Sequence, residues 1–251
     1  MPQRSYNVKR LQLSFEKGPF FYAALNVRLF LILVFQKFDF IFANDLDTLP
    51  AAYLASRLKR KPIIYDSHEL FTEVPELVSR PLVQNCWIRL ERWMLPRVGE
   101  LITVNASIAR IFEQKYKVRA HVVRNVPMRI ENLEPHPKSF LGLTDAQTML
   151  IIQGSGLNVQ RGVEEAVLAM ALIPNAVLFL VGDGDVMPSI KAMVKQMQLQ
   201  ERVRLVGRVP YHELLKYTAA ADLGLALDKP LSLNYALALP NKVFDYIQAG
   251  T

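Results

Sequence analysis

The stretch "MLIIQGSGLNVQRGVEEAVLAMALIPNAVLFLVGDG", residues 149–184, decides the fold class. It contains an apolar run at 149–154, a loop with glycines, an amphipathic run at 162–173 and a second apolar run at 176–184. Short apolar runs bounded by turn residues are typical of buried strands, and the longer run has the spacing of a helix. A strand, a helix and a second strand in this order predict a βαβ unit with parallel strands.

The same alternation continues on both sides of this unit. Further strands are predicted at 38–44, 62–67, 100–105, 120–125, 203–209 and 223–228. Further helices are predicted at 47–60, within 81–98, at 106–117, 187–199 and 211–221, and from about 241 onward. Apolar strands that each precede a helix indicate parallel sheets covered on both faces. The fold class is therefore α/β, with two doubly wound domains in tandem.

Segment 126–148 interrupts the alternation, because it holds three prolines and scattered polar residues without a clear period. Such a composition is typical of a linker. We therefore predict a first domain at residues 1–127, a linker at 128–148 and a second domain at 149–251.

The composition is that of a globular protein, with 51% hydrophobic and 21% charged residues among 251. The single cysteine, Cys86, excludes a disulfide within the chain and a metal site built from a cysteine cluster. Residues 1–127 hold 19 Lys and Arg against 11 Asp and Glu, a balance of +8, whereas residues 128–251 hold 11 against 12, a balance of −1. A basic first half suits an anionic partner, such as lipid, nucleic acid or a phosphorylated substrate, although a solvated basic surface explains it equally well.

Residues 20–42 are apolar enough to raise the question of a membrane span. Arg28, Lys37 and Asp39 interrupt the stretch, and its longest uncharged run is shorter than the ~20 residues that a span requires. We predict a buried helix to about Gln36 and then a strand, with a transmembrane helix as the alternative. The first fifteen residues lack a signal-peptide pattern, so a cytoplasmic location is expected.

The loops after the predicted strands are the places to look for function, because ligands of doubly wound sheets bind beyond the carboxyl ends of the strands. In the second half, Gly154 and Gly156 follow the first strand and allow close approach to the backbone. Arg161 and Gly162 stand where the next helix begins. Free N–H groups at a helix start and a guanidinium suit a diphosphate. An ordinary glycine turn with a surface arginine would give the same pattern.

Two later loops extend this candidate site. Gly207 and Arg208 follow the third strand of the second half, where their backbone could meet the edge of a nucleobase. Lys242 and Asp245 lie three residues apart near the start of the last helix and so share one face. An ammonium suits phosphate oxygens and a carboxylate suits vicinal hydroxyls such as those of ribose. A surface salt bridge between the two is the alternative.

The first half offers a second group of polar residues at strand ends. Asp45 follows one predicted strand, and His68 and Glu69 follow the next. A lone histidine is more often structural than functional, but the three together favour a site. The sequence contains no GxSxG, Walker A, HExxH or CxxC pattern and no metal ligands at usable spacing.

Taken in order, these segments resemble a known family. They are "ANDLDTLPAA", "IIYDSHEL", "VVRNVP", "QGSGLNVQRGVEEAV", "VGDGD", "VGRVPYHEL" and "LPNKVFDYIQAG". Together they are similar to glycosyltransferase family 4, from about residue 18 to the end of the sequence. The resemblance implies the GT-B architecture, in which two Rossmann-like parallel-sheet domains face each other across a cleft.

The resemblance also implies roles for the two domains and for individual residues. The first domain would bind the acceptor, and the second would bind a nucleotide-sugar donor, UDP- or GDP-linked, without a metal or other cofactor. The donor-binding residues that it implies are Gly154, Gly156, Arg161 and Gly162 at the diphosphate, Gly207 and Arg208 at the base, and Asn241, Lys242 and Asp245 on the last helix. In the first domain, His68 would approach the donor sugar as the candidate catalytic residue, with Asp45, Glu69 and Asn125 lining the cleft.

The sequence departs from the family pattern in several places. The first glutamate of the family's acidic pair is replaced by Leu237, eight residues before Asp245, and Lys242 is present instead. A second diphosphate-binding arginine before Arg161 is missing, and Val126 replaces the glycine that follows Asn125. The family's first strand with its glycine-rich acceptor loop, and its closing C-terminal segment, have no counterpart, so we expect a fragment of a longer protein with both domains truncated.

The expected function is that of a retaining glycosyltransferase that moves a hexose from a nucleotide sugar to a glycan or lipid-linked acceptor in cell-surface polysaccharide synthesis. The expected partners are the nucleotide sugar, the acceptor and an anionic membrane surface on its inner, cytoplasmic side, with no nucleic acid. Two alternatives stay open: a GT-B sugar-phosphate epimerase and an inactive nucleotide-binding remnant. A Rossmann dehydrogenase fits less well, because the full GxGxxG pattern is absent.

Overall fold

The computed structural model describes residues 6–251 and divides into two compact units. Unit 1 comprises the chain up to Arg124 together with Ser232–Leu237. Unit 2 comprises Asn125–Leu231 and Ala238–Thr251. The sequence-based division assigned all of 149–251 to one domain and so missed that Ser232–Leu237 belongs to the first unit.

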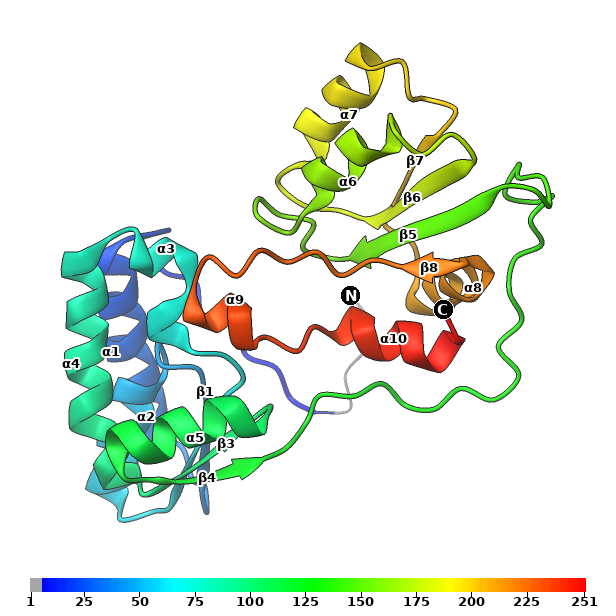
Figure 1. Ribbon diagram of the computed structural model, residues 1–251. Coiled ribbons are helices and arrows are strands. Elements are labelled where there is room, and N and C mark those ends of the chain that lie inside the picture. Colours follow the sequence, from blue (N-terminus) through cyan, green and yellow to red (C-terminus); the bar gives the residue numbers. More distant parts are fainter. Residues whose placement is uncertain (1–5) are drawn as a thin grey trace. The chain divides into compact units, whose positions relative to one another are not determined.

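Unit 1 is built on a four-stranded parallel sheet (Figure 1). Its strands are β1 (Ile41–Asn44), β2 (Ile63–Ser67), β3 (Glu100–Thr103) and β4 (Arg119–Val122), in the order β1-β2-β3-β4. Its helices are α1 (Pro19–Phe35), α2 (Leu49–Lys59), α3 (Pro75–Val78), α4 (Pro81–Val98), α5 (Ala106–Tyr116) and α9 (Leu233–Leu237), with a 3-10 turn η1 at Phe71–Glu73.

The strand order of unit 1 explains where its core lies. The order runs in one direction, and right-handed crossovers then place every connecting helix on the same face of the sheet. Tyr65 and Leu101 on that face are buried in one core with Phe112 of α5. On the opposite face, Phe42 is 46% exposed. The expectation that helices cover both faces is therefore wrong for the described part of unit 1.

Helix α1 is apolar on all sides yet lies at the surface. Its end at Phe35 confirms the prediction of a helix to about Gln36, but none of its residues is buried, so the expected burial is wrong. It packs on α2, where Asn26 donates to the carbonyl of Asp47 (2.8 Å) and accepts from the N–H of Ala51 (3.0 Å). Among residues 6–251, no helix has both the length and the apolarity to cross a bilayer.

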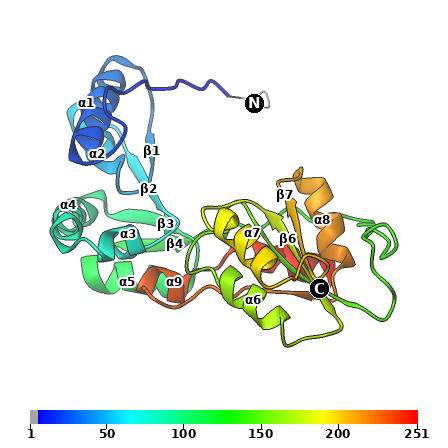
Figure 2. The same ribbon diagram turned by 90° about the horizontal axis from the view of Figure 1, so that it is seen from above.

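Unit 2 contains a second four-stranded parallel sheet, seen from another side in Figure 2. Its strands are β5 (Thr148–Gly154), β6 (Ala176–Gly182), β7 (Val203–Gly207) and β8 (Leu223–Gly224), in the order β7-β6-β5-β8. Its helices are α6 (Val163–Met170), α7 (Met187–Gln196), α8 (Tyr211–Ala220) and α10 (Asn241–Ala249).

The strand order of unit 2 reverses, and both faces of its sheet are covered as predicted. The chain moves outward from β5 to β7 and then returns to place β8 on the other side of β5. Ile152 and Leu180 therefore pack in a core with α6 and α7, whereas Ile151 and Phe179 pack in a core with α8 and α10. Such a reversal creates a crevice at the carboxyl ends of the strands, where doubly wound proteins bind ligands.

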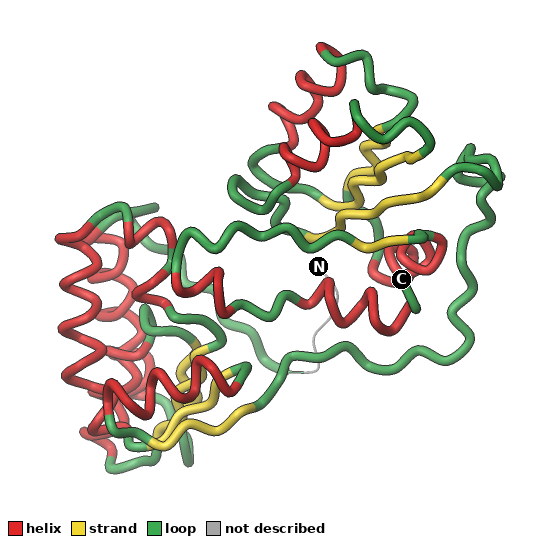
Figure 3. Tube along the Cα trace, in the orientation of Figure 1, coloured by secondary structure: helices red, strands yellow, loops and turns green. Residues whose placement is uncertain are grey.

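The segments between the regular elements differ in how well they were predicted. Residues 126–147 contain no helix or strand, as expected from their prolines, whereas the strand predicted to 125 already ends at Val122 (Figure 3). Strand β8 has two residues instead of the predicted six. The chain after it lies against the start of α6, where the N–H of Lys229 donates to the carbonyl of Gln160 (3.0 Å).

Candidate functional site

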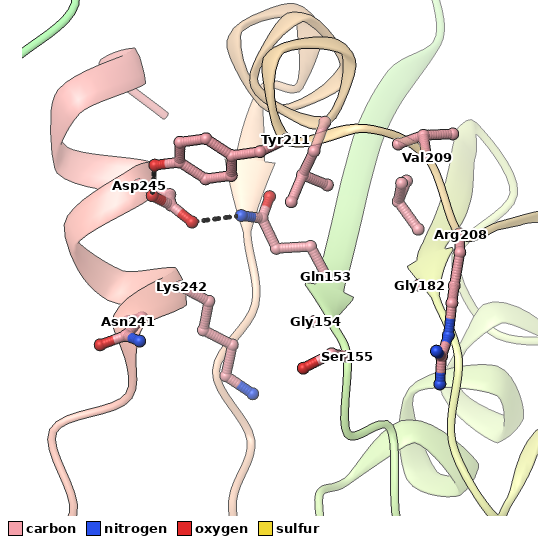
Figure 4. Close-up of a pocket in the computed structure, with 12 residues that line it drawn as sticks. Gln153, Gly154, Ser155, Gly182, Arg208, Val209, Tyr211, Asn241, Lys242 and Asp245 are labelled. Carbon is pink, nitrogen blue, oxygen red and sulfur yellow. Dashed lines mark hydrogen bonds between the residues drawn. The ribbon is translucent and has the colours of Figure 1, made fainter. Parts of the chain in front are cut away.

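A cavity of about 360 Å³ opens beyond the carboxyl ends of β5, β6 and β7 in unit 2 (Figure 4). Its volume is at the lower end of the range for small-molecule sites. The residues that line it are Gln153, Gly154, Ser155, Val181, Gly182, Arg208, Val209, Tyr211, Leu214, Asn241, Lys242 and Asp245. Five of the predicted donor-binding residues are among them: Gly154, Arg208, Asn241, Lys242 and Asp245.

Two side-chain hydrogen bonds hold the carboxylate of Asp245 in the wall of the cavity. Gln153 donates to its Oδ2 (2.9 Å) and the Tyr211 hydroxyl donates to its Oδ1 (2.7 Å), as Figure 4 shows. Asp245 is 6% exposed, and this burial raises the pKa of its carboxyl although the two donors lower it. Burial and the neighbouring Asp245 raise the pKa of Tyr211 to about 12, so its hydroxyl remains a donor near neutral pH.

Gln153 and Tyr211 were missed by the sequence analysis. Gln153 is a buried polar residue near the end of an apolar strand, and Thr218 of α8 donates in turn to its amide oxygen. A polar side chain inside an apolar strand needs a partner, so this position was a readable signal. Tyr211 begins α8 and carried no distinguishing pattern.

Two glycines bring the ends of β5 and β6 close together at the floor of the cavity. Gly182 has a φ of +142°, and a Cβ at this position would lie 1.8 Å from the carbonyl oxygen of Gly154. No other residue type fits there without moving the backbone. Both glycines line the cavity, so part of its wall is main chain without a side chain over it.

Lys242 and Arg161 share one carboxylate, that of Asp228 in the segment after β8. Arg161 Nη1 lies 2.7 Å from Asp228 Oδ1 and Lys242 Nζ lies 3.1 Å from Asp228 Oδ2. The predicted alternative of a salt bridge between Lys242 and Asp245 is wrong, because Lys242 pairs with Asp228 and Asp245 accepts from neutral donors. Arg161 is not among the residues that line the cavity.

The other predicted donor-site residues lie around this centre. Arg208 stands across the cavity from α10 and forms an ion pair with Asp183 (3.1 Å). Gly207 has a φ of +80° with open space beside it, and Gly156 lies exposed in the loop after β5. Gly162 precedes α6 with a φ of +76°, and a Cβ there would lie 2.4 Å from that of Leu227.

In unit 1, the structure brings together two of the predicted residues. His68 Nε2 lies 3.2 Å from Asp45 Oδ2. Glu69 instead accepts from the side chain of Asn234 in α9 (3.0 Å). Asn125, the first residue of unit 2, lies exposed in the segment after β4. The pKa of Asp45 is raised to about 6, mainly by burial, although His68 acts to lower it. Among the described residues, no group of three His, Cys, Asp or Glu side chains could hold a metal ion.

Two parallel-sheet units, one with a polar cavity at the strand ends of a reversed sheet, define the class as the GT-B fold of glycosyltransferases. The model of glycosyltransferase family 4 matches residues 2–127, which is half of the chain. The chain therefore belongs to glycosyltransferase family 4. A search of curated protein sequences found no match.

Solved structures of glycosyltransferases share this fold. HepE of Anabaena in complex with UDP and glucose superposes with a TM-score of 0.68 at 18% identity, over 91% of this chain and 61% of that one. Sucrose-phosphate synthase of Thermosynechococcus elongatus gives 0.66 at 17% identity, over 89% and 61%. The pneumococcal O-GlcNAc transferase GtfA in complex with UDP and GlcNAc gives 0.61 at 11% identity, over 91% and 44%. The chain thus spans about 61% of the length of the first two proteins.

Proposed function

We propose that this chain carries the donor site of a retaining glycosyltransferase, which transfers a hexose from a nucleotide sugar to a glycan or lipid-linked acceptor in cell-surface polysaccharide synthesis. The observation that carries the proposal is the cavity of unit 2, where the ammonium of Lys242 and the carboxylate of Asp245 lie on consecutive turns of α10. Similar structures that contain UDP or a UDP-sugar support a nucleotide sugar as the ligand.

The proposed binding mode follows from the chemistry of the cavity walls. Asp245 accepts hydrogen bonds from the ribose hydroxyls, since each of its oxygens keeps a lone pair beyond the one used by Gln153 or Tyr211. Lys242 lies one turn earlier on the same helix and meets the diphosphate, together with the backbone after β5. Arg208 and Val209, across the cavity, meet the base.

Catalysis in this proposal is electrostatic. Negative charge develops on the departing diphosphate, and Lys242 and Arg161 stabilise it in the way that other enzymes use a metal ion. We propose that transfer proceeds without a metal or other cofactor. His68 is the proposed residue of unit 1 that acts on the sugar, and Asp45 holds its ring at 3.2 Å.

We also propose peripheral contact with an anionic membrane. Phe20, Leu31 and Phe35 of α1 are 69%, 50% and 85% exposed, and residues 1–127 carry a balance of +8. An exposed apolar helix in a basic protein suits the interface of anionic lipids. Sedimentation with anionic and with neutral vesicles tests it: the protein should sediment with the anionic ones, and Phe20→Ser combined with Phe35→Ser should release it. Equal recovery in the supernatant with both vesicle types would contradict it.

Calorimetric titration of the purified chain with UDP, GDP and ADP tests the donor site. One nucleotide should bind saturably, and Asp245→Ala should weaken it by at least tenfold, because a hydrogen bond to a charged acceptor contributes about 1.5–3 kcal/mol. Lys191→Ala, an exposed lysine of α7, is the matched control and should leave the affinity unchanged. A folded protein that binds none of the three nucleotides would refute the proposal, and binding without turnover of any nucleotide sugar would favour an inactive remnant.

A further inference from the structure

Asp228 occupies an unusual position for a carboxylate at the edge of an anion site. One of its oxygens contacts Arg161 (2.7 Å) and the other contacts Lys242 (3.1 Å). The side chains of Asp228 and Lys242 are each 11% exposed, and that of Arg161 is 27% exposed. The three groups therefore form a largely desolvated cluster of two cations and one anion.

The carboxylate is held in this place by the segment that carries it. The N–H of Lys229 donates to the carbonyl of Gln160 (3.0 Å), and the Lys229 ammonium pairs with Glu165 on α6. Leu227 packs directly over Gly162, where a larger residue would collide. Both neighbours of Asp228 thus anchor the segment to the start of α6, so its backbone cannot move away without breaking these contacts.

The charge of the cluster makes Asp228 a competitor of an anionic ligand. Burial disfavours its ionised form, but Arg161 and Lys242 outweigh this effect and hold the pKa of its carboxyl below the usual range. The carboxylate is therefore ionised at neutral pH and cancels one of the two positive charges. A diphosphate that contacts either cation must share it with Asp228 and is repelled by the remaining carboxylate charge.

We propose that Asp228 is a built-in counter-ion of the diphosphate site. Its carboxylate pairs with Arg161 and Lys242 while no ligand is bound. It also lowers the affinity for the nucleoside diphosphate, so that this product can dissociate after transfer. The inference rests on the proposed donor site and adds to it a residue that limits affinity. A purely positioning role, in which Asp228 only aims the two cations, predicts the opposite effect of its removal.

Calorimetry with UDP, inorganic pyrophosphate and uridine separates the two roles. Asp228→Asn keeps the shape and removes the charge, so UDP and pyrophosphate should bind at least tenfold more tightly, whereas uridine, which lacks the diphosphate, should bind as it does to the unchanged protein. Asp228→Glu keeps the charge and serves as the control, with UDP affinity within about threefold of the starting value. Asp228→Asn should also lower the melting temperature of the empty protein, because Lys242 and Arg161 each lose their charged contact with Asp228.

A charge-balanced pair of variants gives an independent test if Asp228→Asn fails to fold. Lys242→Met leaves Arg161 and Asp228 as a neutral pair, so UDP binding should weaken by at least tenfold. Adding Asp228→Asn restores a net charge of +1 and should recover most of this loss. A double variant that binds UDP no better than Lys242→Met alone would overturn the proposal.

The outcomes also distinguish this inference from the proposed function. A starting protein that binds UDP, together with an Asp228→Asn variant that binds it equally or more weakly, refutes the counter-ion role and leaves the donor site intact. A starting protein that binds neither UDP nor pyrophosphate refutes the donor site and the counter-ion role together.

Discussion

Replacing Asp45 by asparagine should stabilise unit 1 at neutral pH. Asp45 is partly buried at the end of β1, and its Oδ1 is buried without a hydrogen-bond partner. Its φ of +59° lies in the left-handed region, which asparagine tolerates as well as aspartate does. The substitution therefore removes a buried charge with little change in shape or backbone preference.

The size of the effect follows from the pKa of this carboxyl, which burial raises from 3.8 to about 6. The folded protein binds the proton of Asp45 more tightly than the unfolded chain does. The free energy of unfolding therefore falls as the pH rises from 3.8 to about 6, and the full cost of the buried charge is present above pH 6. A shift of this size corresponds to about 3 kcal/mol at ~1.36 kcal/mol per pKa unit. Partial solvation and the lost attraction to His68 reduce the expected gain for Asp45→Asn to about 1–2 kcal/mol.

Tryptophan fluorescence during urea unfolding measures this gain, because both tryptophans, Trp87 and Trp93, lie on α4 of unit 1. The free energy of unfolding of Asp45→Asn should exceed that of the unchanged protein at pH 8, and the two should agree near pH 4. Asp39→Asn, at a side chain that is 98% exposed, is the control and should change little at either pH. An Asp45→Asn variant that is less stable at pH 8, or equally more stable at both pH values, would refute the reasoning.

Three further substitutions test separate parts of the structure. Gly182→Ala should lower the free energy of unfolding of unit 2 by about 3 kcal/mol, because its Cβ would lie 1.8 Å from the oxygen of Gly154. Unit 2 holds no tryptophan, so circular dichroism follows its unfolding in urea, and an unchanged midpoint would contradict this prediction. Asn105→Ala should lower the free energy of unfolding of unit 1 by about 1–2 kcal/mol, measured by tryptophan fluorescence in urea, since it removes the N-terminal cap of α5. Tyr211→Phe should weaken UDP binding about fivefold in calorimetry by removing a donor to Asp245, and equal affinity would show that this hydroxyl does not orient the carboxylate.

The sequence predicted most of the regular elements because their patterns are local. The stretch 81–98, in which a helix was expected, is helical throughout as α4, and the other long helices end within a few residues of their expected positions. The expected strand at 38–44 begins only at Ile41, because pairing with β2 starts there. Helix α9 was missed because its five residues are held by distant partners: Asn234 accepts from the N–H of Leu70 (2.9 Å) and donates to Glu69 (3.0 Å).

The candidate site shows the same division between local and distant information. Lys242 and Asp245 were predicted from their spacing on one helix, and both line the cavity. Their interaction partners were not predicted, because Gln153 comes from β5 and Asp228 from the segment after β8, and both are brought to α10 only by the reversed order of the sheet. A spacing rule identifies which residues share a face, but it does not say which groups from elsewhere in the chain will meet them.

The short segment Ser232–Leu237 changes how the chain can be divided. The polypeptide passes between the two units three times, after Arg124, after Leu231 and after Leu237, so a protease that cuts once within 125–147 severs only one of three covalent connections. Two separately expressed halves, split at that point, would not be independent domains either. The second half would carry Ser232–Leu237, which belongs to unit 1. Asn105 in the first half donates to the carbonyl of Leu237 (2.9 Å), so this contact would form only after the two halves had reassembled.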